Sequence, residues 1–275
     1  MKDLITSTGN PKIKFARKLL TDRKERESSG FFVIEGLRLV IEAFEQKAAI
    51  ENLIIAPDLL KSATAEKYVD GFQHIYPDRV MHVSSEVFQS LSSKDGPQGL
   101  AAIVKQNWSS LQQHDRNHPG LVLALDEIAD PGNLGTIIRT ADSVKASAII
   151  LLDKCTDPYD RSALRGSMGA VFSVPLIKST FDELLEFRNH SHIPIIGTSD
   201  RAKSDFHQVE YPADMILLMG SERQGLDDIH FAVCDNVVSI PMLGSSDSLN
   251  LAVATGIILY EILFQHQSST TRSAV

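Results

Sequence analysis

The sequence predicts an α/β protein of two domains, and three observations support this. Short apolar runs alternate with segments of helical spacing through both halves of the 275-residue chain. A chain of this length with 43% hydrophobic residues can bury two cores of ordinary size. The stretch NWSSLQQHDRNHP is polar and without periodicity. We therefore expect a smaller N-terminal domain over residues 1–106, a linker over 107–119, and a larger domain over 120–275.

The N-terminal half opens with a basic segment of helical spacing. Its apolar side is formed by Ile13, Phe15, Ala16, Leu19 and Leu20. Its basic residues are Lys12, Lys14, Arg17, Lys18, Arg23, Lys24 and Arg26. On composition alone, a solvated helix face is the favoured interpretation and a nucleic-acid patch the alternative. The runs FFVIEG, ENLIIA and GLAAIV are predicted strands, and LRLVIEAFEQ is a predicted helix, which together make a small α/β domain.

In the C-terminal half the apolar runs are short and rich in branched residues, which is typical of parallel strands buried on both faces. These runs are LVLALD, AIILL, VFSVPL, IPIIG, MILLMG and VVSIPM. The segments LGTIIRTADSV and FDELLEFRNH have helical spacing. The last segment, SLNLAVATGIILYEILF, is apolar nearly all round, so we expect the sheet or a second subunit to bury it.

Composition excludes several classes of protein. Cys155 and Cys234 lie far apart without CxxC spacing, so neither a disulfide framework nor a zinc site is predicted. A polar start and the lack of any stretch of 18 apolar residues predict a cytoplasmic protein without a membrane span. A net charge of −8 argues against coating nucleic acid by bulk electrostatics, although it allows a local basic patch.

Three loops stand where ligands bind in an open parallel sheet, beyond the carboxyl ends of the strands. In DEIADPGNLGTIIRTADS, Asn133 follows a turn and could cap the next helix, while Arg139 lies beside its buried stripe and could be a surface residue. In MGSERQGLDD, Gly220 and Gly225 flank Glu222 and let the backbone approach a ligand. Each of these features taken alone is more often structural than functional.

The third loop, VVSIPMLGSSDSLNLAVATG, leads into the final apolar helix. Ser248 is a suitable N-cap for that helix, and Asn250 would fall in its first turn. Asn250 is a polar group at the entrance of an apolar helix, so it requires a hydrogen-bond partner.

Read in order, NLGTIIRTA, GSERQGL and IPMLGSSDSLNLAVA resemble the three motifs of the SpoU family of RNA ribose methyltransferases. The stretch RSALRGSMGAVFSVPL is similar to the family's Arg-then-Ser-Gly-Ala stretch. In the N-terminal half, NPKIKFARKLL, FFVIEGLRLVIEAF and GPQGLAAIV resemble the substrate-binding domain often joined to this catalytic domain. The resemblance covers nearly the whole chain. It departs from the third motif at Leu251 and Ala252, positions that we expect to face packing.

The resemblance implies a C-terminal parallel-sheet domain with a deep trefoil knot, one of the rare exceptions to unknotted topology. It implies S-adenosylmethionine as the cofactor, with no metal, bound against the backbone of loops that hold Thr198, Gly220, Ile240 and Leu249. It also implies a homodimer with each active site near the subunit interface. The expected substrate is RNA, either ribosomal RNA of the large subunit or transfer RNA.

The resemblance assigns Arg139 to activation of the ribose 2′-hydroxyl. Because a guanidinium hardly deprotonates in proteins, we expect it instead to orient the hydroxyl and stabilise developing negative charge. The resemblance places Asn133, Glu222, Ser248 and Asn250 in the same pocket. Glu222 is expected to pair with Arg139. RNA phosphates would be bound by Arg165 and by the basic helix through Lys12, Lys14, Arg17 and Lys18.

Two alternatives remain open. One is an RNA-binding relative that keeps the fold without catalysis. The other is a knotted methyltransferase that modifies an RNA base, although Arg139 and Asn133 favour ribose. An ordinary dinucleotide-binding domain is excluded because no GxGxxG follows an early strand.

Overall fold

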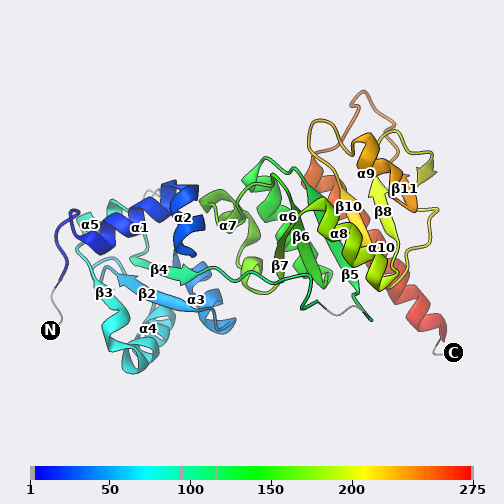
Figure 1. The fold of residues 1–275 in the computed structure, drawn as a ribbon. Coiled ribbons are helices and arrows are strands. Elements are labelled where there is room, and N and C mark those ends of the chain that lie inside the picture. The colour runs from blue at the N-terminus through cyan, green and yellow to red at the C-terminus, as the bar shows by residue number, and fades with distance from the viewer. Residues whose placement is uncertain (1–3, 93–95, 115–116, 274–275) are drawn as a thin grey trace. The chain divides into compact units, whose positions relative to one another are not determined.

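The computed structural model describes residues 4–92, 96–114 and 117–273, and the chain divides into two compact units (Figure 1). We call residues 1–107 together with 159–172 the N-terminal unit, and residues 108–158 together with 173–275 the C-terminal unit. The segment 159–172 therefore packs with the N-terminal unit although it lies between two strands of the C-terminal unit in the chain.

The N-terminal unit is a four-stranded sheet covered by short helices. Its strands are β1 Phe31–Glu35, β2 Ile50–Ile55, β3 Val80–His82 and β4 Leu100–Lys105. They lie in the order β1-β4-β2-β3, with β4 antiparallel to β1 and β2 and with β3 parallel to β2. Its helical elements are α1 Pro11–Thr21, α2 Arg23–Ser29, α3 Leu37–Glu45, α4 Ala63–Ile75, η1 Pro77–Arg79, α5 Ser85–Gln89, α7 Arg161–Ser167 and η2 Ala170–Phe172.

Helix α1 is the predicted amphipathic basic helix. The side chain of Asn10 accepts a hydrogen bond from the backbone of Lys12, and a proline follows as the first helical residue, so the start is capped. Ile13, Ala16 and Leu19 are buried in the core of the unit. The three strands predicted in this half and the helix after β1 are confirmed, whereas the three-residue strand β3 was not predicted.

The C-terminal unit holds a seven-stranded sheet in the order β7-β6-β5-β10-β8-β11-β9, and all its strand pairs are parallel. Its strands are β5 Leu121–Asp126, β6 Ala148–Leu152, β7 Leu176–Ser179, β8 Ile195–Thr198, β9 Ser204–Asp205, β10 Met215–Met219 and β11 Asn236–Ser239. Strands β5, β6 and β10 are buried almost throughout, which confirms the prediction of parallel strands covered on both faces.

The helices of this unit are α6 Pro131–Ser143, α8 Phe181–Ser191, α9 Asp228–Ala232 and α10 Leu251–Ser273. Helix α10 is buried on one side only. Thr255, Ile258 and Ile262 are fully buried, whereas Val253 and Phe264 are 50% and 57% exposed. Helix α10 packs against α6, where Gly256 lies beside Thr140. One chain therefore covers only part of the helix that the sequence predicted to be buried.

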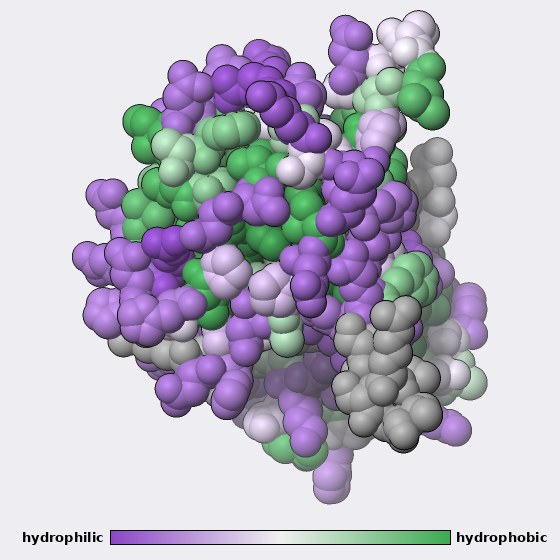
Figure 2. Space-filling model, turned by 90° about the vertical axis from the view of Figure 1, so that its right-hand side faces the viewer, coloured by the Kyte–Doolittle hydropathy of each residue, from purple (hydrophilic) through white to green (hydrophobic). Residues whose placement is uncertain are grey.

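Exposed hydrophobic residues gather near α10. Figure 2 shows a group of hydrophobic residues at the surface, surrounded by hydrophilic ones. Beside Val253 and Phe264, the large exposed hydrophobic side chains of this part of the chain are Leu243, Leu249 and Tyr260. Within the described ranges, no helix combines the length and apolar character that a membrane span requires.

Candidate active site

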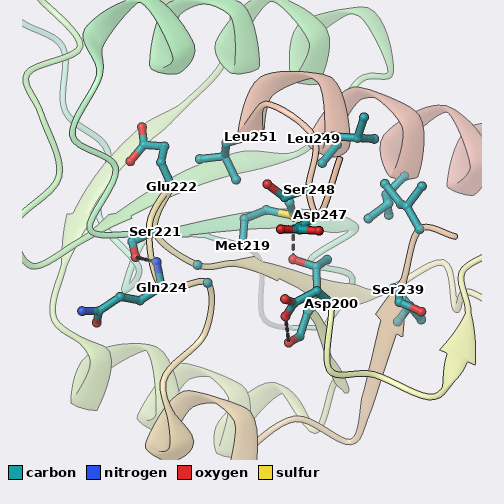
Figure 3. A pocket seen from close by; sticks show the side chains of 18 of the residues that line it. Asp200, Met219, Ser221, Glu222, Gln224, Ser239, Asp247, Ser248, Leu249 and Leu251 are labelled. Atoms are coloured by element: carbon teal, nitrogen blue, oxygen red, sulfur yellow. Dashed lines mark hydrogen bonds between the residues drawn. The ribbon is translucent and has the colours of Figure 1, made fainter. Parts of the chain in front are cut away.

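One pocket lies beyond the carboxyl ends of β8, β10 and β11, where ligands bind in open parallel sheets (Figure 3). It is open to solvent, and its cavity volume is about 280 Å³. Its lining comes from the loops after these strands and from the first turns of α10. The lining residues are Thr198, Ser199, Asp200, Met219, Gly220, Ser221, Glu222, Arg223, Gln224, Gly225, Val238, Ser239, Ile240, Met242, Asp247, Ser248, Leu249, Leu251, Ala254 and Ile258.

The loop after β10 is a tight turn that only glycine permits at its first position. A Cβ atom at Gly220 would lie 2.2 Å from the carbonyl carbon of Gly225. Gly225 itself has a φ of 64°, in the left-handed region. The backbones of Ser221 and Gly225 hydrogen-bond to each other in both directions. This closure directs the intervening side chains outward, and Figure 3 shows those of Glu222 and Gln224 pointing apart.

Glu222 joins the loop after β10 to the region between β5 and α6 by hydrogen bonds. Its carboxylate accepts from the backbone amides of Ala129 at 3.1 Å and Asp130 at 3.2 Å, in the loop between β5 and α6. It also accepts a longer bond from the side-chain amide of Asn133, at 3.4 Å. The Oδ1 atom of Asn133 in turn accepts from Asn250 Nδ2 at 2.9 Å. The three regions that carry the sequence motifs are therefore connected through these side chains.

The helix caps at the site differ from those expected. Asp130 caps α6 by accepting from the backbone of Asn133 at 2.8 Å, so Asn133 lies in the first turn and its amide is available to other groups. Asn250 caps α10 by accepting from the backbone amides of Ala252 and Val253. The prediction that Ser248 caps this helix was wrong, because α10 begins three residues later. Ser248 instead lines the pocket.

Arg139 lies on the exposed side of α6, outside the pocket lining. Its guanidinium has no hydrogen-bond or ion-pair partner among the residues that the structure describes. The expected pairing with Glu222 was wrong, because that carboxylate is occupied by backbone amides and by Asn133. Arg139 is therefore available to contact a bound molecule.

The structure brings most of the predicted site residues together. Thr198, Gly220, Ile240 and Leu249, predicted to bind the cofactor, all line the one pocket, as do Glu222 and Ser248. Asn133 and Asn250 lie outside the lining and connect to it through Glu222. Arg165, Lys12, Lys14, Arg17 and Lys18 belong to the N-terminal unit.

Sequence reasoning missed two carboxylates of the pocket, Asp200 and Asp247. Figure 3 shows them on one side of the cavity and Glu222 on another. With Arg223 as the single cation in the lining, the pocket carries an excess of negative charge that favours a cationic ligand. Asp200 follows the end of β8 as Glu222 follows the end of β10, so the strand-end rule could have found it.

A second acidic group lies beneath the loop between β5 and α6. Burial raises the pKa of Asp126, the last residue of β5, and the nearby imidazole of His230 opposes that rise. His230 Nε2 lies 3.8 Å from the carboxylate of Asp126. On its other side, the pKa of Asp227 is lowered, chiefly because the carboxylate accepts a hydrogen bond from the backbone of His230. This cluster holds the end of β5 beside the start of α9.

Several basic residues of α1 and α2 are already engaged within the N-terminal unit. Arg26 is 3% exposed and donates to the carbonyl oxygen of Leu19. Arg17 donates to Thr8 and Ser90, and ion pairs join Lys18 to Glu25 and Arg23 to Glu27. The side chains without such a partner among the described residues are those of Lys12, Lys14 and Lys24.

The pocket also fits an amphipathic ligand. Met219, Val238, Ile240, Leu251 and Ile258 offer an apolar wall, and carboxylates and backbone groups stand opposite. Such a lining suits an aromatic base joined to a cationic amino-acid moiety. Among the described residues, no group of three or more His, Cys, Asp or Glu side chains has a metal-binding arrangement.

Comparison with known proteins finds a matching family for each half of the chain. The SpoU rRNA Methylase family matches residues 120–260, and the MRM3-like substrate binding domain matches residues 10–102. Among curated relatives, the 23S rRNA (guanosine(2553)-2′-O)-methyltransferase RlmP of Bacillus subtilis is 27% identical, over 94% of this chain and 98% of its own length. The 23S rRNA (uridine(2479)-2′-O)-methyltransferase of Streptomyces viridochromogenes is 29% identical, over 92% of this chain and 89% of its own.

Solved structures agree with these relatives. An AdoMet-bound rRNA methyltransferase from Sinorhizobium meliloti superposes with a TM-score of 0.87 at 33% identity, and covers 96% of this chain and 98% of that one. The SpoU methyltransferase AviRb from Streptomyces viridochromogenes, in complex with the cofactor AdoMet, has a TM-score of 0.83 at 27% identity, with coverage of 94% and 99%.

Proposed function

The chain belongs to the SpoU rRNA methylase family, and we propose that it transfers a methyl group from S-adenosylmethionine to a ribose 2′-hydroxyl of large-subunit ribosomal RNA. The observation that carries this proposal is the hydrogen-bonded connection from Glu222 through Asn133 to Asn250, which unites the three motif regions at one acidic pocket. The names of the relatives, which include 23S rRNA 2′-O-methyltransferases, support the choice of ribose and of ribosomal RNA.

S-adenosylmethionine supplies a methyl group on a sulfonium centre that is already reactive towards an oxygen nucleophile. The protein must therefore align the hydroxyl with the methyl group and ease the loss of its proton. The pocket contributes to this alignment by holding the methyl donor. Its carboxylates, Asp200, Glu222 and Asp247, favour a ligand of positive charge, and Thr198 and Gly220 line the same pocket.

Arg139 is the group that we propose contacts the ribose 2′-hydroxyl. It is exposed and has no partner among the residues that the structure describes, and a guanidinium donates to oxygen without accepting a proton. We propose that it orients the ribose oxygen and an adjacent phosphate and stabilises negative charge as it develops. Asn133 and Asn250 hold the loop in front of α6, and Ser248 adds a hydroxyl at the pocket lining.

RNA is proposed to bind first to the N-terminal unit. Lys12, Lys14, Arg17 and Lys18 on α1, together with Arg165 on α7, are the cations for its phosphates. Contacts of this kind position the substrate without reading its sequence. In this scheme residues 1–106 act as the RNA-binding domain, 107–119 as the linker and 120–275 as the catalytic domain, except that the segment 159–172 packs with the N-terminal unit and adds Arg165 to RNA binding.

We also propose the quaternary and topological features that the family implies. Val253, Tyr260 and Phe264 are exposed apolar residues along α10, and a second copy of the chain would cover them in a homodimer. A deep trefoil knot is compatible with the strand order, because β8 lies between β10 and β11, which both follow it in the chain. The cytoplasm is the proposed location because ribosomal RNA is the proposed substrate.

The proposal is tested by mapping 2′-O-methylated positions in ribosomal RNA from cells with and without the protein. We expect one position of the 23S rRNA to lose its methyl group in cells without the protein and to regain it when the gene is returned. A lost methyl group on a base, or a set of modifications that does not change, would contradict the proposal. A loss confined to transfer RNA would keep the reaction and replace the substrate.

A further inference from the structure

The segment 159–172 is built into the N-terminal unit by aromatic and polar contacts. The ring of Phe32 in β1 packs near those of Tyr159 and Phe172, with centroid distances of 4.4 Å and 6.2 Å. The hydroxyl of Tyr159 donates to the carbonyl oxygen of Asn107 and accepts from its backbone amide. A Cβ atom at Gly169 would lie 2.5 Å from the side chain of Glu42. The segment therefore packs as part of this unit.

Helix α7 is the helix of this segment, and it carries two arginines one turn apart. At seven residues it is too short to be stable by itself, so its position depends on tertiary contacts. Arg161 donates to the carbonyl oxygen of Leu91 at 2.8 Å. Arg165 is exposed, and its guanidinium has no hydrogen-bond or ion-pair partner among the described residues. Arg165 is thus the cation that α7 presents to solvent.

Both arginines border a small hollow in the N-terminal unit. Leu20 from the end of α1, Leu39 from α3 and Glu35 from β1 line the same hollow. Glu35 accepts a hydrogen bond from the hydroxyl of Ser92. The hollow therefore brings Arg165 beside the end of the basic helix α1, whose lysines we assign to RNA phosphates.

Buried Arg26 connects the two helices. Its guanidinium donates to the carbonyl oxygen of Leu19 in α1 at 2.8 Å and lies 3.7 Å from the carboxylate of Asp160. Asp160 is also the N-cap of α7, because it accepts from the backbone of Ser162 at 2.8 Å. A buried guanidinium requires such partners, since an uncompensated charge away from water is costly. The carboxylate of Asp160 thus caps the start of α7 and, through Arg26, links α7 to α1.

We propose that Arg26, through Asp160, is a positioning residue for RNA binding: it fixes α7 on the N-terminal unit so that Arg165 adds a phosphate contact to those of α1. This role rests on the proposed function. It also explains why a basic residue within a basic segment is buried, where it cannot contact RNA itself.

The decisive variant is Asp160→Asn. Asparagine is as good an N-cap as aspartate, so α7 keeps its start, but the charge that pairs with Arg26 is lost. Simple electrostatics predicts tighter RNA binding, because one negative charge has been removed from the unit. Positioning predicts the opposite sign, a loss of about threefold to tenfold, as for one ordinary hydrogen-bonded contact. The matched control is Asp22→Asn, the N-cap of α2, which removes the same charge from a similar place.

The measurement is the dissociation constant of the full-length protein for a 23S rRNA transcript, with S-adenosylmethionine affinity measured in parallel. We expect Asp160→Asn to weaken RNA binding, Asp22→Asn to leave it unchanged or tighter, and cofactor affinity to stay constant in both. Combined with Arg165→Ala, Asp160→Asn should cause no further loss. If Asp160→Asn unfolds the protein, Arg26→Lys keeps the buried charge and shortens its reach, and it should show the same coupling to Arg165.

Two results separate the possible failures. RNA binding by Asp160→Asn that equals or exceeds that of Asp22→Asn, or additive losses in the double variant, would overturn the positioning role alone. A wild-type protein that binds S-adenosylmethionine but not the transcript would overturn the proposed RNA substrate, and the positioning role with it.

Discussion

The two units differ most in charge. The N-terminal unit has 17 Lys and Arg against 15 Asp and Glu, a net charge of +2, whereas the C-terminal unit has 10 against 20, a net charge of −10. The acidic unit contains the pocket, whose carboxylates suit a cationic methyl donor, and it repels a phosphate backbone. The contrast indicates a division of labour in which RNA is attracted to one unit and the methyl donor to the other.

The largest expected effect is that of Arg139→Ala, because Arg139 is the exposed cation that the acidic unit offers to the ribose. The rate of methyl transfer should fall by about 100-fold or more, the usual cost of removing a group that stabilises developing charge. Cofactor affinity, measured by calorimetry, should stay within about twofold because Arg139 lies outside the pocket lining.

Lys203→Ala is the matched control, since it removes one positive charge from an exposed position of the same unit. A near-normal rate for Arg139→Ala, or an equal loss in both variants, would refute the role of Arg139.

Gly220→Ala should abolish most cofactor binding and leave RNA binding intact. The new Cβ atom would meet the backbone of Gly225 at 2.2 Å, so the turn that borders the pocket must open. We expect the dissociation constant for S-adenosylmethionine to rise by about tenfold or more. Gly244→Ala, with nothing within 4 Å of its new Cβ atom, is the control. Parallel losses of RNA affinity would show that the two functions are not divided as we propose.

Replacing Lys12 and Lys14 together by alanine tests whether the N-terminal unit attracts the RNA. RNA affinity should fall by about tenfold, and the salt dependence of binding should weaken by about one counterion per lost phosphate contact. S-adenosylmethionine affinity should not change. The control replaces Lys61 and Lys67, two exposed lysines elsewhere in the same unit. Equal losses of RNA affinity in both double variants would show that α1 contributes only general positive charge and not specific phosphate contacts.

Asn250→Asp should give the smallest effect. The carboxylate still caps α10, but it cannot donate to Asn133 Oδ1, so the connection between the motif regions is broken. We expect methyl transfer to fall severalfold with little change in thermal stability. Asn250→Ala should in addition cost about 1 kcal/mol for the lost cap. An unchanged rate in Asn250→Asp would show that the bond to Asn133 has no catalytic importance.

The regular elements of both sheets could be predicted because their cause is local. Strands such as β5 and β10 are covered on both faces, and the run of branched apolar residues in each strand indicates this burial directly. Very short elements leave too little pattern, so β3 and β9, of three and two residues, were missed. The apolar run VFSVPL was predicted as a strand, but only its last residue, Leu176, lies in β7, and Ala170–Phe172 forms a 3₁₀ turn beside β1.

The partners of the site side chains could not be predicted in the same way. The resemblance to the SpoU motifs indicated that Glu222 belongs to the site, but its acceptance of the amides of Ala129 and Asp130 depends on how two distant loops meet. Ser248 was the predicted cap of α10, but the backbone placed Asn250 in that role. The placement of 159–172 in the N-terminal unit depends on packing around Phe32, which leaves no periodic signal.

The most direct test of the account is the chemical identity of the product. The purified protein is incubated with a 23S rRNA transcript and isotope-labelled S-adenosylmethionine, and the RNA is then digested to nucleosides and analysed by mass spectrometry. We expect label in a 2′-O-methylated nucleoside. Label in a methylated base, or no label despite bound cofactor and RNA, would contradict it.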